Sequence, residues 1–203
     1  MASRPVPAAS VQPPGAQPVD LSALPARDRI LHAAHDLFYA EGIRATGVDR
    51  VIAESGVAKL TFYRHFPSKN DLILAFLGFR NERWIAWFSD ALRRHGGSLK
   101  AMVPSLREWF DAGSYRGFAF INAVSELGTN MPEAVEISRS HKRDMEVLIA
   151  NLLPASRRRG ADAKAIAVAV DGAIIRAQMD RGPDAALKAL AELLKGFAPR
   201  AAA

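Results

Sequence analysis

The chain has 203 residues, of which 49% are hydrophobic and 24% charged, so it can bury a substantial core in one or two domains. It contains no cysteine, which excludes disulfides, thiolate nucleophiles and cysteine-bound zinc. The formal net charge of +6 fits a polyanionic partner but does not require one, because a basic excess also serves solubility. No apolar run approaches the ~18 residues that a membrane-spanning helix needs, so we expect no membrane partner.

The first segment, residues 1–24, is rich in proline and alanine and carries few charges. Its apolar residues occur singly, so it cannot bury enough surface to offset the entropy of folding. We therefore predict a disordered arm over 1–24.

From residue 25 onward, apolar residues recur at the 3.6-residue spacing of helices, and no strand pattern persists. The fold class predicted is all-α. The nine expected helices span 26–41, 47–54, 58–65, 69–94, 99–112, 117–127, 132–153, 162–180 and 183–197. Gly42 and the pair Gly96-Gly97 mark helix ends, and we expect Pro104 to bend the fifth helix and Pro183 to begin the last.

Two capping boxes are predicted, in which a hydroxyl and a carboxylate three residues apart satisfy free backbone amides. Thr46 and Asp49 would open the second helix, and Ser68 and Asp71 the fourth. On the first helix, His32 and His35 are expected to lie on the solvent side.

The second and third helices are joined by a tight turn at Ser55-Gly56-Val57, a helix-turn-helix arrangement that carries its second helix into the DNA major groove. Val51 is expected to pack on Phe38 of the first helix. Either Leu60 or Phe62 would anchor the third helix to the same core, and this packing would fix the angle at which the third helix projects.

The outer face of the third helix carries donors suited to DNA. Lys59 can reach guanine or phosphate, Thr61 suits thymine or adenine edges, and Tyr63 and His65 suit phosphate oxygens. Lys69 lies at the next helix N-terminus, where free amides favour an anion. Across residues 44–69 five lysines and arginines face two carboxylates, a local net charge of +3.

The segment GVAKLTFYRHFPSKNDL, residues 56–72, resembles the signature of the TetR family of bacterial repressors, a likeness that extends over roughly 27–72. In that family the third helix reads operator bases, and the residues that align with Thr46, Tyr63, His65 and Lys69 hold phosphates. Ala58 stands where the family often has serine or threonine, so this chain loses ~1 kcal/mol of helix capping there. The DNA-binding residues expected are Thr46, Lys59, Leu60, Thr61, Tyr63, Arg64, His65 and Lys69.

The resemblance also implies a second domain that forms a homodimer and encloses a small-molecule pocket. We therefore expect a helix-turn-helix DNA-binding domain over 25–70 and a ligand-binding and dimerisation domain over 71–203. Aromatic residues concentrate in the middle of the chain, which is typical of an apolar pocket but equally of a plain core. The candidate pocket residues are Arg80, Trp84, Trp87, Phe88, Met102, Trp109, Phe110, Phe120, Asn122 and Glu126, with Arg80, Asn122 and Glu126 as polar anchors.

The last two helices are the candidate dimer interface. The helix at 162–180 is apolar nearly all round, which is typical of a helix buried on every side, and the last helix has a leucine seam at 3-4-3 spacing. Two such helices from each chain can form a four-helix interface across a two-fold axis, although both could instead complete the monomer core. The candidate interface residues are Ala165, Ala169, Gly172, Ala173, Arg176, Leu187, Leu190, Leu194 and Phe197.

The function predicted is a dimeric transcriptional regulator in the bacterial cytoplasm, associated with the nucleoid: a repressor released from a palindromic operator by a largely apolar or aromatic ligand. No nucleophile–base pair, metal-ligand spacing or phosphate loop points to an enzyme or to a cofactor. Three alternatives remain: a non-sensing or activating regulator of the same family, a helical enzyme or carrier that uses the aromatic pocket, and a DNA-organising protein without sequence preference.

Overall fold

The computed structural model describes residues 20–112, 115–180 and 182–197. Over these residues the chain is all-α, with nine α-helices and no strand. Two short 3-10 turns, Leu21–Ala23 and Leu99–Ala101, precede α1 and α5. The helices are α1 (Ala26–Glu41), α2 (Val48–Ser55), α3 (Lys59–His65), α4 (Lys69–Arg94), α5 (Met102–Phe110), α6 (Ala119–Leu127), α7 (Pro132–Asn151), α8 (Arg159–Met179) and α9 (Asp184–Lys195).

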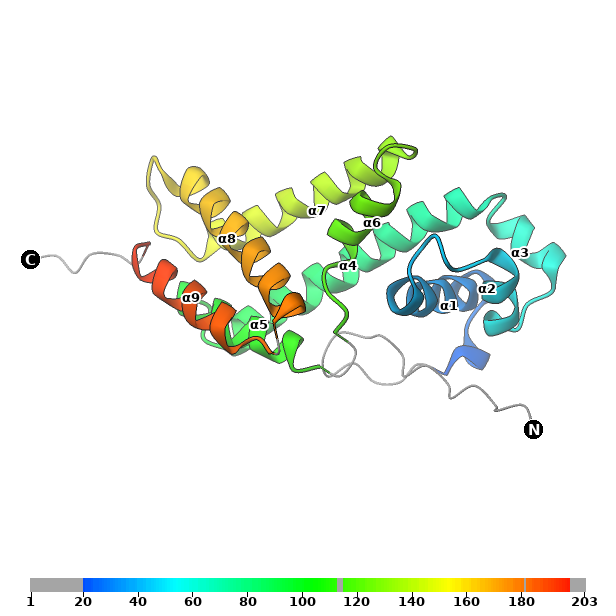
Figure 1. The fold of residues 1–203 in the computed structure, drawn as a ribbon, viewed down its shortest axis with the longest axis horizontal. Coiled ribbons are helices and arrows are strands. Elements are labelled where there is room, and N and C mark those ends of the chain that lie inside the picture. The colour runs from blue at the N-terminus through cyan, green and yellow to red at the C-terminus, as the bar shows by residue number, and fades with distance from the viewer. Residues whose placement is uncertain (1–19, 113–114, 181, 198–203) are drawn as a thin grey trace, which may run out of the picture.

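Helices α1, α2 and α3, here called the head, lie together at one end of the elongated molecule (Figure 1). Their apolar faces meet in one core, where Phe38, Val51, Phe62 and Phe66 are buried. Of the two residues that could anchor α3, Phe62 is the one in the core, while Leu60 points outward and is 73% exposed.

The 26-residue helix α4 runs from the head through the middle of the molecule (Figure 1). It packs on α1 at one end and on α7 and α5 further along. Its predicted capping box is present: the Ser68 hydroxyl accepts from the Asp71 amide at 3.1 Å, and the Asp71 carboxylate accepts from the Ser68 amide at 3.0 Å. The start of α4 is therefore fixed by its own sequence.

Helices α4–α9, here called the bundle, form the rest of the described chain. Helix α7 packs on α4, α6 and α8, and α8 packs on α9, which lies far from the head (Figure 1). One continuous set of buried apolar residues extends from the head into the bundle, so a displacement at one end is resisted by packing at the other.

Several predicted details are corrected by the structure. Helix α8 begins at Arg159, earlier than expected, and Pro104 lies in the first turn of α5, where a missing amide costs little, rather than bending it. Pro183 caps α9 instead of forming its first residue. Of the predicted arm, residues 1–19 lie outside the described residues, and Leu21–Ala23 form a 3-10 turn.

The prediction of a capping box at Thr46 and Asp49 is wrong. The Thr46 hydroxyl turns inward and donates to the carbonyl of Gly42 at 2.8 Å, while Gly47 occupies the cap of α2 without a side-chain hydrogen bond. The prediction that His35 is solvated is also wrong, because its ring is buried against α4 and His32 is half-buried.

Candidate functional site

The exposed face of α3 presents the donors that the sequence indicates. Lys59, Tyr63, Arg64 and His65 are exposed, Tyr63 at 42%, and Thr61 is half-buried. Phe62 between them is fully buried and packs edge-on to the Tyr63 ring, with centroids 5.2 Å apart. The helix is therefore held by one side while the opposite side is open to a partner.

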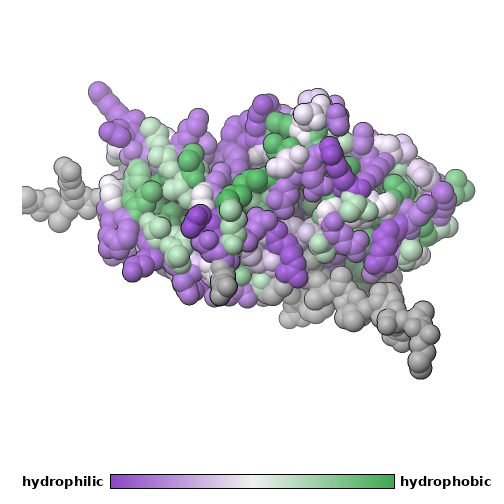
Figure 2. Space-filling model, viewed as in Figure 1, coloured by the Kyte–Doolittle hydropathy of each residue, from purple (hydrophilic) through white to green (hydrophobic). Residues whose placement is uncertain are grey.

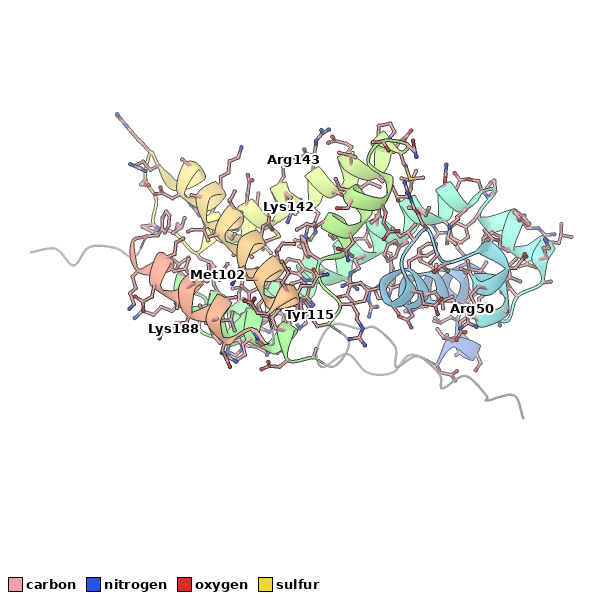
Figure 3. All side chains as sticks on the ribbon, viewed as in Figure 1. Arg50, Met102, Tyr115, Lys142, Arg143 and Lys188 are labelled. Carbon is pink, nitrogen blue, oxygen red and sulfur yellow. The ribbon has the colours of Figure 1, made fainter. Side chains whose placement is uncertain are left out.

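The cations near α3 are only weakly engaged within the chain. The Lys59 ammonium lies 3.4 Å from the Asp49 carboxylate, and both side chains are well exposed. An exposed pair of this kind contributes about 0–1 kcal/mol, so Lys59 is available to another anion. On the same unit, Arg50 forms ion pairs with Glu41 and Glu54 (Figure 3).

Lys69 and Thr46 differ from the rest of the predicted set. Lys69 donates to the carbonyl of Arg44 at 3.5 Å, and partial burial lowers its pKa although Glu126 opposes that shift. Thr46 is 1% exposed and its hydroxyl is already paired. The role of phosphate ligand that the family resemblance implies for the Thr46 hydroxyl therefore has no support in its position.

A buried polar network, the His35–Tyr39–Arg80 cluster, joins the head to the bundle. Arg80 of α4 donates to His35 Nε2 at 3.0 Å, and its guanidinium carbon lies 3.9 Å from the Tyr39 ring centroid. Since Nε2 accepts that bond, the His35 proton is on Nδ1, which lies 2.9 Å from the Asp36 carboxylate. Burial lowers the pKa of His35 to about 4, so the ring is neutral near pH ~7.

The same cluster reaches the segment before α6. The Tyr39 hydroxyl donates to the carbonyl of Gly117 at 2.8 Å and accepts from the Arg116 amide at 2.9 Å. Gly117 has φ +88°, a conformation that other residues rarely adopt, so this segment is shaped for the contact. Arg80, predicted as a pocket anchor, thus connects α4 to His35 and Tyr39 of the head.

Helix α6 also contacts the head directly. The Glu126 carboxylate accepts from the Arg44 amide in the α1–α2 loop at 2.9 Å. A cavity of about 280 Å³ lies beside this contact, lined by residues of α1, its following loop, α4 and α6. Asn122 and Glu126, predicted as anchors of the aromatic pocket, line this junction cavity instead.

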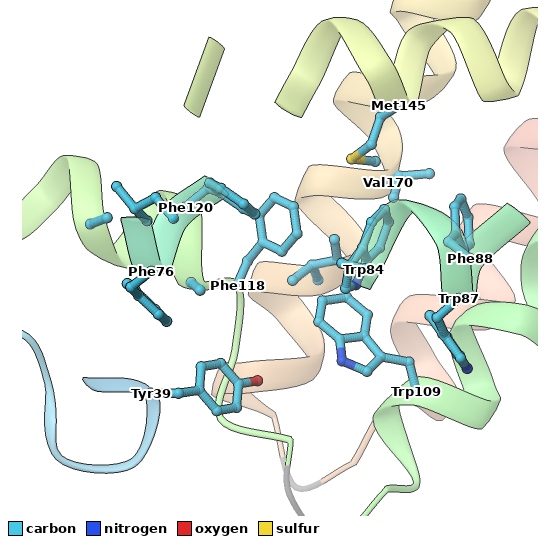
Figure 4. Packing of buried hydrophobic residues seen from close by; sticks show 14 of the residues in the cluster. Tyr39, Phe76, Trp84, Trp87, Phe88, Trp109, Phe118, Phe120, Met145 and Val170 are labelled. Carbon is cyan, nitrogen blue, oxygen red and sulfur yellow. The ribbon is translucent and has the colours of Figure 1, made fainter. Parts of the chain in front are cut away.

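The predicted pocket aromatics gather inside the bundle (Figure 4). The Trp84 ring stacks on Phe88 with centroids 4.7 Å apart and meets the edges of Trp109 and Phe118 at 5.5 and 5.8 Å. We call this group the aromatic cluster; its members are Trp84, Trp87, Phe88, Met102, Trp109, Phe110, Phe118 and Phe120, all buried.

Four buried polar atoms of the bundle, two of them on tryptophans of this cluster, lack partners in the described part of the chain. They are Nε1 of Trp84 and of Trp87, Oγ of Ser105 and Nε2 of His141. His141 was not predicted as a site residue, although it continues the buried row of Ala134, Ser138 and Met145 on α7, where a large polar side chain is unexpected. A buried polar atom left unpaired costs about 1–3 kcal/mol, so these positions call for an explanation.

The dimer candidates divide into two groups. Ala165, Gly172 and Arg176 are exposed on α8, with Ala169 and Phe197 half-buried. In contrast, Leu187, Leu190, Leu194 and Ala173 are buried within the single chain and have no area to give to a partner, which corrects that part of the prediction. The leucine seam faces the monomer core because α9 packs on α8 and α5.

The open faces of α8 and α9 also carry large apolar side chains that were not predicted. Val168 and Met179 of α8 are 66% and 74% exposed, and Leu193 of α9 is 46% exposed. Helix α8 is therefore not buried on every side in one chain. Figure 2 shows hydrophobic residues gathered over this end of the molecule.

Among the described residues, no helix is both long and apolar enough to span a bilayer, and no three histidine, aspartate or glutamate side chains are grouped as metal ligands.

Comparison with known proteins places the head in a defined family. Residues 30–76 match the family described as "Bacterial regulatory proteins, tetR family". The chain is 31% identical over 85 residues to the HTH-type transcriptional activator FasR of Mycolicibacterium smegmatis, covering 42% of this chain and 39% of FasR. It is 44% identical over 80 residues to the HTH-type transcriptional regulator SAUSA300_2515 of Staphylococcus aureus, covering 39% and 43%. The matches thus span less than half the length of these curated relatives.

The likeness to solved structures covers more of the chain. SCO4454, a TetR-family transcriptional regulator from Streptomyces coelicolor, superposes with a TM-score of 0.73 at 29% identity, over 85% of this chain and 93% of that one. The head, the long α4 and the bundle are therefore shared as one arrangement. The head of this chain therefore carries the DNA-binding helix-turn-helix of the TetR family of bacterial transcriptional regulators, and the described chain shares its fold with a regulator of that family.

Proposed function

We propose that the chain is a homodimeric, sequence-specific repressor that a small ligand releases from a palindromic operator. The observation that carries the DNA-binding part is the exposed face of α3, held from behind by the buried Phe62. We assign Lys59 and Thr61 to base edges, with Leu60 and Arg64 beside them. We assign Tyr63, His65 and Lys69 to phosphates.

The exposed apolar side chains of α8 and α9 support the dimer. Large apolar side chains that lie open on neighbouring helices are typical of an interface. Ala165 and Gly172 lie on the same open side of α8 and allow a second helix to approach closely. We assign the interface to the open faces of α8 and α9, where the exposed small residues Ala165, Gly172, Ala185 and Ala189 accompany Val168, Met179 and Leu193.

The contacts between head and bundle support release by a ligand. The head touches α4 through His35 and Arg80, the segment before α6 through Tyr39, and α6 through Glu126. A ligand that displaces α6 or α4 must therefore turn the head. Two heads that fit successive major grooves, about 34–36 Å apart, lose that fit after a shift of a few Å, and a coupling of about 1–3 kcal/mol corresponds to a 5–150-fold release.

We place the domain boundary at the start of α4 near residue 70, and the protein in the bacterial cytoplasm, where its DNA partner is. Activation is the second candidate function, since the relative FasR is named an activator. Both readings use the same head and dimer, and they differ only in the effect that the bound protein has on transcription.

The test is selection of DNA fragments from a random library by the purified full-length chain. We expect one palindromic sequence, bound about 10³-fold or more above unrelated duplex. Recovery of fragments without a common sequence would favour a DNA-organising protein. Lys59→Ala is the companion variant, and it should reduce the ratio of the affinity for the operator to that for unrelated duplex. An equal loss of affinity for both duplexes would instead assign Lys59 to phosphate.

A further inference from the structure

His141 is the most deeply placed ionisable group that the regulator described above does not use. It lies on α7, is fully buried, and its ring stacks on Phe120 with centroids 4.0 Å apart. The rings of Trp84 and Phe118 are each centred 5.1 Å away. The imidazole is thus part of the wall of the aromatic cluster.

The hydrogen-bond network fixes which nitrogen of His141 carries the proton. Asn81 donates its amide NH2 to the Asp144 carboxylate at 2.9 Å, so its carbonyl oxygen is the atom that faces His141. That oxygen lies 2.6 Å from His141 Nδ1, which must therefore be the donor. In the neutral ring Nε2 then holds a lone pair, and it has no partner in the described chain.

The surroundings of the ring keep it neutral. Burial lowers the pKa of His141 well below its ordinary value, and the charges of Lys142 and Arg80 act in the same direction. Both cations are already engaged: Lys142 pairs with Asp171 and Arg80 bonds to His35. The site therefore offers one fixed hydrogen-bond acceptor among aromatic rings, with the nearby cations committed elsewhere.

A groove between α6 and α7 brings the surface close to His141. An open, largely apolar groove of about 340 Å³ lies there, and Phe120, Ser138 and Lys142 are among its lining residues. Figure 3 shows Lys142 on α7 at this side of the bundle. Phe120 lines the groove and also stacks on His141, so this ring lies between the groove and the imidazole.

We propose that the ligand of this regulator is a neutral aromatic molecule with a hydroxyl group, and that the hydroxyl donates to His141 Nε2. The proposal rests on the ligand response argued under Proposed function and names the ligand class. An aromatic ring suits the surrounding rings. A carboxylate has no proton to donate to Nε2, and an ammonium ion would be repelled by Lys142 and Arg80. Trp84 Nε1 is a second unpartnered group that can donate to the ligand.

The experiment uses four probes with the same methyl-substituted ring: 4-methylphenol, toluene, 4-methylbenzoate and 4-methylbenzylammonium. Affinity for the full-length chain is measured by calorimetry. Tryptophan emission reports the place of binding, because the chain's three tryptophans, Trp84, Trp87 and Trp109, all belong to the aromatic cluster. We expect 4-methylphenol to bind about tenfold more tightly than toluene, and neither charged probe to bind.

The variant His141→Phe keeps an aromatic ring and removes the acceptor. In it 4-methylphenol should fall to the affinity of toluene, while toluene itself is unchanged. Equal binding of phenol and toluene to the wild type, tighter binding of a charged probe, or a preference that survives in His141→Phe would each overturn the proposal. So would a failure of all four probes to alter the emission, since a buried water would then be enough to satisfy Nε2. The wild-type series decides the question even if the variant misfolds.

Operator binding is measured on the same samples to separate this proposal from the function on which it rests. A chain that binds no DNA refutes the regulator. If the chain binds its operator and prefers 4-methylphenol, but 4-methylphenol does not release it from the operator, the proposed ligand class stands and the proposed release mechanism is refuted. If the chain binds its operator but shows no preference among the probes, only the inference about His141 is refuted.

Discussion

The head and the bundle differ in how many of their buried polar atoms have hydrogen-bond partners. In the head, Thr46 and Ser55 each donate to a carbonyl, and His35 is bonded on both ring nitrogens. In the bundle, Trp84, Trp87, Ser105 and His141 each keep a buried atom unpaired, whereas the described head has one such atom, Nε of Arg29. An interior whose polar groups are nearly all paired favours one rigid shape, whereas an interior with several unpaired groups is stabilised by a ligand that pairs with them. We infer that the head is built to keep its form and the bundle to accept a ligand.

The largest effect is expected from removing the anchor of the head. Phe62→Ala should lower the free energy of unfolding by about 3–5 kcal/mol and abolish operator binding, because the emptied core no longer holds α3. Leu60→Ala is the matched control on the same helix, and it should change stability by less than about 0.5 kcal/mol since Leu60 is exposed. Chemical denaturation of both variants measures this, and equal losses would contradict the assigned orientation of α3.

Acid should loosen the contact between the two regions. The pKa of His35 is about 4 in the folded chain against 6.5 when it is free, so the unfolded chain binds the extra proton. The neutral His35 therefore makes its full contribution to the free energy of unfolding above pH ~6.5. As the pH falls toward ~4, about 2–3 kcal/mol of that free energy is lost. His35→Gln can still accept from Arg80 but does not titrate. Denaturation at pH ~7 and ~4.5 should show a smaller acid loss in that variant than in the wild type, and identical losses would mean that His35 is protonated without penalty.

Removal of one hydroxyl from the open face of α3 should weaken DNA binding while leaving the fold intact. Tyr63→Phe deletes a hydrogen bond to a charged phosphate, which is worth about 1.5–3 kcal/mol, and should reduce the affinity for every duplex alike. Titration of the selected operator and of an unrelated duplex checks both statements. Unchanged affinity would remove Tyr63 from the interface.

The smallest effect is expected from removing the Tyr39 hydroxyl, which joins the head to the bundle. Tyr39→Phe keeps the ring beside Arg80 but removes the bonds to Gly117 and Arg116, and should cost about 1 kcal/mol of stability and reduce the release of operator by 4-methylphenol. Tyr115→Phe is the control, because its hydroxyl donates to the Ile174 carbonyl within the bundle at 2.9 Å. A similar loss of release in both variants would show that the Tyr39 contact does not transmit the ligand's effect.

Local sequence signals predicted most of the helix bounds. Ser68 with Asp71 fixes the start of α4, and Gly56, with φ +64°, forms the turn before α3 because a left-handed residue is needed there. Each of these signals depends only on residues a few positions away in the sequence, so it can be recognised before the fold is known.

Signals that depend on tertiary packing were predicted less well. The 3-4-3 spacing of Leu187, Leu190 and Leu194 marks an apolar face but does not say what covers it, and the cover proved to be the same chain. The positions of His35 and His141 depend on partners 45 and 60 residues away, which no local pattern reveals. For the same reason the sequence did not indicate that Asn122 and Glu126 line the cavity at the junction with the head.

The central claim is that two heads act as one rigid pair on DNA. Since the chain has no cysteine, Ala53→Cys on the exposed side of α2 places a single spin label on each head. Pulsed electron resonance on the selected duplex should give one narrow label-to-label distance, of the order of the ~34–36 Å between successive major grooves, and 4-methylphenol should shift it by a few Å. Absence of any dipolar coupling between labels, with DNA or without it, would contradict the account, because a lone head cannot bind a palindrome as proposed.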